Sequence, residues 1–287
     1  MKILIFGSSG FLGKYIFDTL KKENKFKIYD NGIKKKKINL TKKIFIEKII
    51  CKIRPDLIIN CAAISDVDIC EKNPKLSKKI NLDLIRNIIN LKKKLKFNFI
   101  HFSTDQIYNP KKNIINKEKK IYKPLNIYSK HKIYSESLCL KNSSLVFRIN
   151  LIGKSLSKKD SFTDKIYTKL KNKEKVIGFS DAVYSPLNVL TLSNIIKKIL
   201  KNKKHKNKGL FNLGSVGKIS KYNLIIKFSR IVKLYNHKNI IKENINNFCY
   251  TKRSHFNAMN VNKFKKFFKI HLPLLSEEIK KTAYKYV

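Results

Sequence analysis

The sequence lacks any long hydrophobic run. Its 287 residues contain no apolar stretch close to the ~20 residues that a membrane-spanning helix needs. The apolar stretch from Ile3 to Phe6 is too short for a secretion signal and leads directly into glycine-rich sequence. We therefore expect a cytoplasmic protein with no membrane partner.

Cysteine is scarce and scattered. The five cysteines include no Cys-x-x-Cys pair, so the sequence predicts no metal knuckle and no metal site. Their odd number, together with the missing export signal, predicts reduced thiols. Cys61 follows a predicted strand, and we interpret it as a small buried hydrophobic residue rather than a reactive thiol.

Acidic residues are also few. The chain has 19 Asp and Glu against 65 Lys and Arg, which gives a formal net charge of +46 and raises the hypothesis of nucleic-acid binding. Only five of the basic residues are arginine: Arg54, Arg86, Arg148, Arg230 and Arg253. Lysine, isoleucine and asparagine have A/T-rich codons, so a biased genome gives this composition without selection for a partner. We expect solvated lysine faces and no specific nucleic-acid partner, although the positive field would attract anionic dinucleotides and nucleotide sugars.

Strand and helix patterns alternate through the first 150 residues. The predicted strands are 2–6, 26–29, 57–60, 97–103 and 145–149, and the predicted helices are 11–22, 41–52, 74–96 and 126–140. Later helices are expected at 162–170, 190–200 and 220–234, with strands at 175–177 and 209–213. Alternation predicts an α/β protein with a Rossmann-type, doubly wound parallel sheet. We predict a Rossmann domain over residues 1–150 and a smaller C-terminal lobe over residues 151–287, some of whose elements return to the sheet.

A glycine motif, Gly7-Ser8-Ser9-Gly10-Phe11-Leu12-Gly13, follows the first predicted strand. Gly7 permits the tight turn, Gly10 lets the backbone approach a pyrophosphate, and Gly13 lets the helix pack closely. Free N–H groups at the N-terminus of the helix favour the anion. The motif between a strand and a helix therefore predicts a site for NAD or NADP.

Two further features agree with a dinucleotide. Asp30 ends the second predicted strand, where an acid commonly holds the adenosine ribose hydroxyls. It favours NADH, whereas the lysines at 34–37 could compensate and admit NADPH, so both cofactors stay open. The third strand ends in Asn60-Cys61-Ala62-Ala63, whose small side chains would let a cofactor lie close to the backbone. Taken alone, close packing explains these small residues more simply.

Tyr128 and Lys132 form a Tyr-x-x-x-Lys pair within a predicted helix. Residues four apart share a helix face, so the ammonium would lie beside the phenol and lower its pKa. Such a tyrosine can donate a proton to a carbonyl oxygen during hydride transfer, while the lysine bonds the nicotinamide ribose. Tyr167 and Lys171 have the same spacing, but Tyr128 opens the helix between the fourth and fifth predicted strands.

Thr104 and Asp105 follow the fourth predicted strand, at the sheet edge where such sites form. Thr104 would offer its hydroxyl to the same carbonyl oxygen. Asp105 either orients substrate hydroxyls or caps a turn, and the sequence leaves both roles open.

Together these residues resemble the extended short-chain dehydrogenase/reductase superfamily and, within it, the dTDP-4-dehydrorhamnose reductase family. The likeness covers nearly the whole chain. It is carried by the glycine motif and by residues 54–63, 67–71, 101–108 and 124–132, with a looser match over 252–263. It implies reduction by NADH or NADPH of a 4-keto group on a nucleotide-linked deoxysugar, dTDP-linked in the family, for cell-surface polysaccharides. A nucleotide sugar is the implied partner, with a homodimer as one option.

By position, the resemblance makes Tyr128 the proton donor, Lys132 its partner, and Thr104 and Asp105 the substrate contacts. The implied cofactor contacts are Gly7, Gly10, Phe11, Leu12, Asp30, Asn39, Leu40, Ala62, Ala63, Ile64, Ser65, Tyr128 and Lys132.

The chain departs from the family pattern at several positions. Asn39 stands where the family has Asp. The family's Arg-Thr-Ser-Trp stretch appears as residues 148–151, Arg-Ile-Asn-Leu, so a substrate-stacking tryptophan is absent from this chain. Gln106 follows Asp105 where 4,6-dehydratases have Glu, a second acid/base. A 4-epimerase or dehydratase, and a non-catalytic subunit like the methionine adenosyltransferase beta subunit, are the alternatives.

Overall fold

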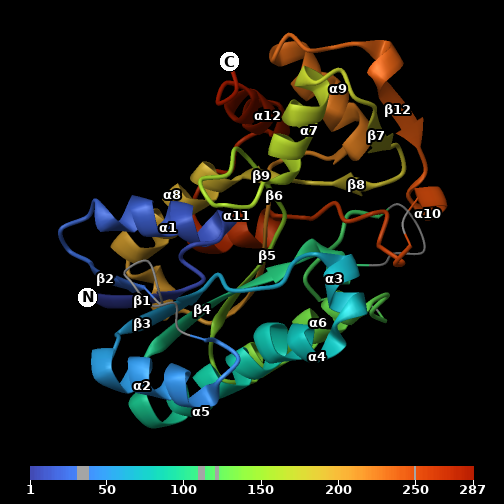
Figure 1. The fold of residues 1–287 in the computed structure, drawn as a ribbon. Helices are drawn as coiled ribbons and strands as arrows, with labels where there is room; N and C mark the ends of the chain where they lie inside the picture. The colour runs from blue at the N-terminus through green and yellow to red at the C-terminus, as the bar shows by residue number, and fades with distance from the viewer. Residues whose placement is uncertain (31–38, 109–113, 120–122, 249) are drawn as a thin grey trace. The chain divides into compact units, whose positions relative to one another are not determined.

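The computed structural model describes residues 1–30, 39–108, 114–119, 123–248 and 250–287. Its largest sheet has six strands in the order β10-β5-β4-β3-β1-β2 (Figure 1). These strands are β1 (Lys2–Phe6), β2 (Lys27–Asp30), β3 (Leu57–Asn60), β4 (Asn98–Thr104), β5 (Leu145–Ile149) and β10 (Gly209–Leu213). β1 pairs in parallel with β2 and β3, and β3 pairs in parallel with β4. The predicted Rossmann-type, doubly wound α/β fold is confirmed, because the chain winds outward in both directions from β1.

Contacts between residues divide the chain into two units, and neither unit is continuous in sequence. The first contains residues 1–104, 126–148 and 193–211, and the second contains residues 105–125, 149–192 and 212–287. The predicted division into 1–150 and 151–287 did not place residues 105–125 outside the first unit, which they leave after β4. Residues 193–211 return to the first unit with the second half of a helix and the start of β10, a return of the kind predicted for the C-terminal lobe.

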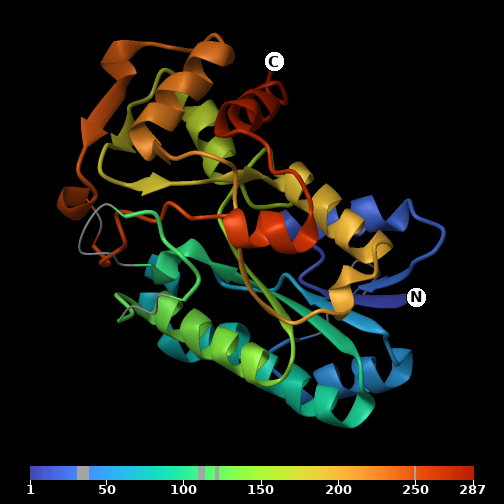
Figure 2. The ribbon, with the colours of Figure 1, turned by 180° about the vertical axis from the view of Figure 1, so that it is seen from behind.

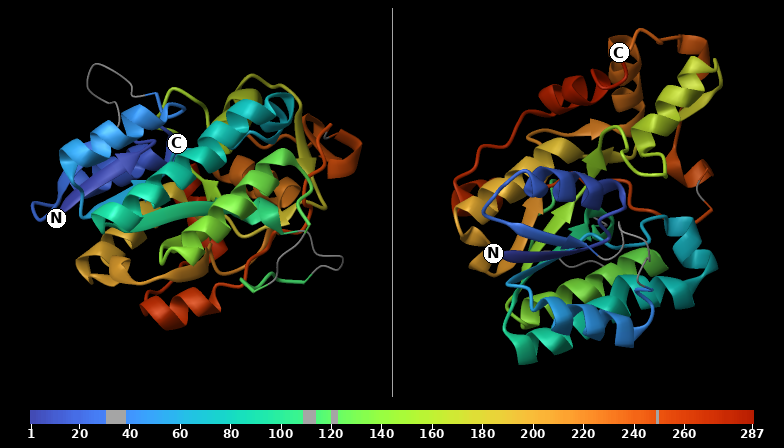
Figure 3. Two further views of the ribbon diagram at one scale, coloured as in Figure 1. Left: turned by 90° about the horizontal axis from the view of Figure 1, so that it is seen from below. Right: turned by 60° about the vertical axis from the view of Figure 1, so that its left-hand side comes forward.

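Helices cover both faces of the sheet within the first unit. Those before residue 149 are α1 (Phe11–Lys21), α2 (Lys43–Ile53), α3 (Val67–Lys72), α4 (Pro74–Lys78), α5 (Leu84–Leu95) and α6 (Ile127–Lys141). α2, α5 and α6 lie side by side on one face (Figure 3). α1 lies on the other face beside α8 (Val189–Lys201), where the Thr19 and Ser193 hydroxyls are 2.9 Å apart. Strands covered on both faces need apolar residues throughout, and residues 3–6 of β1 are fully buried.

The long helix predicted over residues 74–96 is interrupted. α4 and α5 are joined by a π-helical turn at Lys79–Asp83. α3, which precedes α4, is absent from the prediction; it begins where the Asp66 carboxylate accepts hydrogen bonds from the backbone N–H groups of Asp68 and Ile69. A π-turn adds one residue without changing which side chains are apolar, so hydrophobic spacing does not reveal it.

The second helix begins later than predicted, at Lys43 instead of Thr41. The Asn39 amide oxygen accepts hydrogen bonds from both the backbone N–H and the hydroxyl of Thr41, at 2.9 and 2.7 Å. Thr41 therefore donates its hydroxyl to Asn39 and does not cap the helix. The lysines at 34–37, which bear on NADPH, lie outside the described residues.

The second unit is built from short strands and helices (Figure 2). Its strands are β6 (Leu151–Ile152), β7 (Val176–Phe179), β8 (Val183–Tyr184), β9 (Leu187–Asn188), β11 (Ile219–Ser220) and β12 (Ile240–Glu243). Its helices are α7 (Phe162–Lys171), α9 (Lys221–Ile231), α10 (Ile245–Phe248), α11 (Asn262–Phe268) and α12 (Leu275–Ala283). β7 pairs in parallel with β12, and α7 and α9 pack beside them around Ile166, Ile225 and Phe228. Most of these strands have two residues, too few to produce a periodic pattern in the sequence.

Short 3-10 turns complete the described structure, at Asp105–Ile107, Lys204–Lys206 and His237–Asn239. Within the residues that the structure describes, no helix combines the length and the apolar character needed to cross a membrane.

Candidate active site

The loop after β1 is packed as tightly as its glycines allow. Gly7 has a φ of +77°, and a Cβ atom there would lie 2.5 Å from the backbone nitrogen of Ala62. A Cβ at Gly13 would lie 2.0 Å from the carbonyl oxygen of Gly7. Neither position accepts a side chain, because the loop contacts both the end of β3 and the first turns of α1.

Gly10 differs from the other two glycines. A Cβ there would meet only the Gly7 oxygen, at 3.3 Å, which is a tight contact but far from the overlap at Gly7 and Gly13. Gly10 is the N-cap of α1 and offers no side chain to the free N–H groups of the first turn. The arrangement leaves an open cradle of backbone donors at a helix N-terminus, which fits a phosphate group. Leu12 faces the core, so only its backbone can reach such a group.

Asp30 ends β2 at the same sheet edge as the glycine loop, since it lies opposite Ile5 of β1. Asn39 and Leu40 are already engaged elsewhere. The Asn39 amide oxygen holds Thr41, and Leu40 packs against the core beneath α2 and α5. Phe11 is partly exposed, and its ring contacts that of Tyr15 edge-on.

The segment after β3 is fixed by an asparagine that the sequence analysis missed. The side chain of Asn81 bonds both backbone groups of Ile64: Oδ1 accepts from its N–H and Nδ2 donates to its carbonyl, each at 3.0 Å. Asn81 lies in the π-helical turn, which gave no signal in the sequence. Ala63 and Ser65 remain exposed on either side of Ile64, where a cofactor could reach them.

Tyr128 and Lys132 lie one turn apart near the start of α6. Asn126 caps this helix by accepting a hydrogen bond from the Ser129 backbone N–H at 2.8 Å. Tyr128 packs against Val67 and Cys70 of α3. The position of Tyr128 is therefore set by both the helix cap and the segment that follows β3.

Lys132 is only 2% exposed, and its ammonium donates a hydrogen bond of 2.6 Å to the carbonyl oxygen of Phe102 in β4. The structure thus places Lys132 beside the end of the strand that Thr104 terminates. Burial lowers the pKa of Lys132 to about 8, because it disfavours the charged form. Burial raises the pKa of the neighbouring Cys61 thiol, as expected for an unreactive residue, although Cys61 is half-buried and not fully buried as predicted.

Thr104 and Asp105 lie on either side of the boundary between the two units. Thr104 is buried at the end of β4 in the first unit. Asp105 begins a 3-10 turn in the second unit, where its Oδ2 atom accepts a hydrogen bond of 2.6 Å from the amide of Asn150. Asp105 therefore opens a turn and also holds Asn150, which the sequence analysis did not single out.

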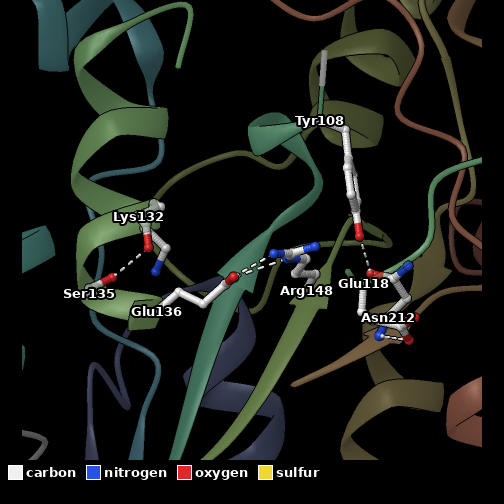
Figure 4. A network of polar contacts seen from close by, with 7 residues as sticks. All are labelled: Tyr108, Glu118, Lys132, Ser135, Glu136, Arg148 and Asn212. Atoms are coloured by element: carbon white, nitrogen blue, oxygen red, sulfur yellow. Dashed lines mark hydrogen bonds and ion pairs between the residues drawn. The ribbon is translucent and has the colours of Figure 1, made fainter. Parts of the chain in front are cut away.

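Two further polar arrangements were missed by the sequence analysis. Arg148 of β5 pairs with Glu136 of α6 through two hydrogen bonds, of 2.5 and 3.0 Å, in the buried interior of the first unit (Figure 4). In the second unit, the Tyr108 hydroxyl donates to the side-chain oxygen of Asn212 at 2.6 Å (Figure 4). Each pair joins residues far apart in the sequence, so no local pattern announces it.

No set of three or more His, Cys, Asp or Glu side chains in the described part of the chain is arranged to hold a metal ion. The cysteines at 51, 61, 70 and 139 are free thiols.

Comparison with known proteins gives a family match over the whole chain: residues 1–287 match the model of the RmlD substrate binding domain. Among curated proteins, GDP-6-deoxy-D-talose 4-dehydrogenase of Aggregatibacter actinomycetemcomitans is 27% identical over 212 residues, 70% of each chain. The dTDP-4-dehydrorhamnose reductase of Salmonella typhimurium is 27% identical over 53% of this chain and 52% of its own length. Methionine adenosyltransferase 2 subunit beta of Bos taurus is 26% identical over 53% of this chain and 47% of its own.

Solved structures share the fold along the whole chain. A dTDP-4-dehydrorhamnose reductase from Clostridium acetobutylicum superposes with a TM-score of 0.88 at 20% identity, covering 99% of both chains. One from Bacillus anthracis, solved in complex with NADP, has a TM-score of 0.86 at 21% identity and covers 99% of both.

Proposed function

The chain belongs to the RmlD substrate binding domain family, and we propose that it reduces the 4-keto group of a nucleotide-linked deoxysugar with NADH or NADPH. The observation that carries this proposal is the position of Lys132. Its buried ammonium is held at the carboxyl end of β4, one turn after Tyr128 and at the same sheet edge as the glycine loop. That edge is where parallel sheets of this kind bind their ligands.

The residues present fit a dinucleotide. Gly10 and the first N–H groups of α1 would hold the pyrophosphate, and Asp30 would hold the adenosine ribose. Ala63, Ile64 and Ser65 would line its path along the end of β3, with Ala62 beneath them. NADH is weakly favoured, because a carboxylate at residue 30 opposes a 2′-phosphate.

The chemistry requires a proton donor beside the bound keto group. When bound, the dihydronicotinamide supplies a hydride to the carbonyl carbon. Tyr128 gives its hydroxyl proton to the carbonyl oxygen, and the ammonium of Lys132 stabilises the resulting phenolate. Thr104 donates a hydrogen bond to the same oxygen, and Asp105 contacts the sugar hydroxyls. The family resemblance supports a dTDP-linked deoxysugar made for cell-surface polysaccharides as the substrate.

A non-catalytic binding subunit is the second candidate. It is favoured by the similarity to methionine adenosyltransferase 2 subunit beta, which is as close in identity as the reductase from Salmonella typhimurium. A dehydratase has less support, because Gln106 follows Asp105 and cannot act as the second acid/base that elimination of water needs. A 4-epimerase is separated from the reductase by the consumption of cofactor.

The test is a reductase assay over a panel of nucleotide 4-keto sugars with NADH and with NADPH. Consumption of the reduced cofactor in proportion to keto sugar supports a reductase, whereas turnover without consumption indicates an epimerase. Tyr128→Phe should lower kcat by about 10²–10⁴-fold while leaving the NADH dissociation constant nearly unchanged. Tyr134→Phe is the matched control, since Tyr134 lies on the same helix and is exposed. NADH binding with no turnover of any keto sugar would favour the binding subunit.

A further inference from the structure

A buried imidazole lies behind the proposed catalytic lysine. His101 is fully buried in β4, and both of its ring nitrogens have neighbours. Nδ1 lies 3.3 Å from the amide nitrogen of Asn60, at the end of β3. Nε2 lies 3.2 Å from the Ser135 hydroxyl and 3.3 Å from the Nζ atom of Lys132, both on α6. His101 therefore connects the third strand to the helix that carries Tyr128 and Lys132.

The orientation of the Asn60 amide is fixed by the backbone of Ala62. Asn60 Nδ2 donates to the Ala62 carbonyl, and Asn60 Oδ1 accepts from the Ala62 N–H, both at 3.3 Å. A reversed amide would place N–H against N–H and oxygen against oxygen, so only one orientation satisfies both bonds. The second hydrogen on Nδ2 then points to His101, and Nδ1 of the imidazole must accept it.

This assignment decides where the imidazole carries its hydrogen. Burial, and then the charge of Lys132, lower the pKa of His101 well below its usual value, so the ring is neutral and has a single N–H. Because Nδ1 accepts, that N–H is on Nε2. Ser135 agrees with this assignment: its hydroxyl donates to the Lys132 carbonyl at 3.0 Å, which leaves a lone pair for Nε2–H.

The N–H of His101 therefore also faces the side-chain nitrogen of Lys132. The other groups that face Lys132 are the thiols of Cys61 and Cys139 and the carboxylate of Glu136. Burial keeps both thiols neutral by raising their pKa, and the carboxylate is bound by Arg148. Within the described part of the chain, Lys132 forms no ion pair, and Figure 4 shows its side chain apart from the Glu136–Arg148 pair.

We propose that His101 is a positioning residue whose Nε2–H, fixed by Asn60, favours the neutral amine form of Lys132. An N–H aimed at Nζ opposes an ammonium there but donates to the lone pair of a neutral amine. The inference rests on the proposed role of Lys132 as partner of Tyr128. Burial is the largest cause of the lowered pKa of Lys132. An N–H on the His101 nitrogen that lies 3.3 Å from Nζ would act in the same direction. Lys132 can then change protonation near the working pH of the enzyme.

The first measurement needs no variant. In the protein labelled with ¹⁵N-histidine, we expect the His101 ring to show the neutral Nε2–H form throughout the range of folding. A hydrogen on Nδ1 would overturn the proposal. Loss of a signal in His101→Gln assigns the resonance.

The second measurement follows the pKa of Lys132 by NMR of protein labelled with ¹³C at the lysine ε-carbon, with Lys132→Arg to assign the signal. We expect His101→Met, which removes the N–H, to raise this pKa by about one pH unit. His101→Gln places an amide N–H near the Nε2 position and should restore it. Ser135→Ala removes only the competing acceptor, so it should leave the pKa unchanged or lower. An unchanged pKa in His101→Met contradicts the proposal.

Kinetics separate this inference from the proposed function. The alkaline limb of the plot of kcat against pH reports the titration of Tyr128 and Lys132 together. We expect this limb to shift to higher pH in His101→Met and to return to its wild-type position in His101→Gln. If the NMR shift occurs but the wild-type protein reduces no keto sugar, the proposed function fails and the inference stands. If the wild-type protein is active and His101→Met moves neither the limb nor the NMR titration, the inference alone fails.

Discussion

Two buried cations of the first unit, Lys132 and Arg148, have opposite surroundings. Arg148 donates two hydrogen bonds to the Glu136 carboxylate, so its charge is compensated. Lys132, one turn before Glu136 on α6, donates to a backbone carbonyl oxygen and forms no ion pair within the described residues, because the nearby Glu136 carboxylate is bound by Arg148. A buried charge without a counter-ion is costly and is readily neutralised by a shift in pKa. Pairing thus fits a structural role for Arg148, and the lack of an ion pair fits the proposed role of Lys132 in proton transfer.

The largest effect should separate activity from stability at Lys132. We expect Lys132→Met to lower kcat by about 10²–10⁴-fold without lowering the free energy of unfolding, because the buried charge contributes no stability. Lys92→Met is the matched control. Lys92 also donates to a backbone carbonyl, that of Asn142, but it is only partly buried and lies on α5. Steady-state kinetics and urea unfolding measure both quantities, and a strongly destabilised Lys132→Met protein would break the comparison.

At Arg148 we expect the larger effect on stability, in contrast to Lys132, where we expect it on activity. Arg148→Met leaves the Glu136 carboxylate buried without a partner, which should reduce the free energy of unfolding by about 3–5 kcal/mol. Replacing both residues, as Glu136→Met with Arg148→Met, should recover most of that loss, because no isolated charge remains. Urea unfolding of the two single variants and the double variant completes a mutant cycle. Equal losses in single and double variants would show that the pair does not act as a unit.

The pH dependence of stability gives a third test. The pKa of Lys132 is about 8 in the folded protein, below the unfolded value, so the unfolded chain binds more protons between about pH 8 and 10.4. The free energy of unfolding should therefore rise through this window, by up to about 3 kcal/mol from this one group. Subtracting the curve of Lys132→Met from that of the wild-type protein isolates the contribution. A flat difference curve would mean that the charge of Lys132 is compensated after all.

The smallest effect is expected at Lys96, a basic residue that is exposed and shares neither the surroundings of Lys132 nor those of Arg148. Lys96 is exposed, follows α5, and has a φ of +51°, a conformation that suits glycine. Lys96→Gly should raise the free energy of unfolding by about 1 kcal/mol, because the left-handed backbone strains a residue with a Cβ. Lys94→Gly, inside the last turn of α5, should instead lower it by about 0.5–1 kcal/mol. Thermal unfolding measures both changes, and the same sign in both would contradict the backbone argument.

The sequence by itself determined the strand–glycine loop–helix unit, the parallel sheet, and the position of Tyr128 and Lys132 one turn apart on a helix. Each of these depends on residues within a few positions of one another, where spacing and backbone geometry are sufficient. The sequence also indicated a second lobe with elements that return to the sheet, but it did not indicate that residues 105–125 belong to the second unit.

Only the tertiary structure decided what surrounds the proposed catalytic residues Tyr128 and Lys132. The contacts of His101 in β4 come from Asn60 in β3 and Ser135 in α6. Arg148 in β5 pairs with Glu136 in α6. Hydrogen bonds and desolvation depend on distances of a few ångströms, which the sequence does not specify for residues tens of positions apart. For that reason the Tyr-x-x-x-Lys spacing identified Lys132, while its low pKa and its unpaired charge became evident only once the chain was folded.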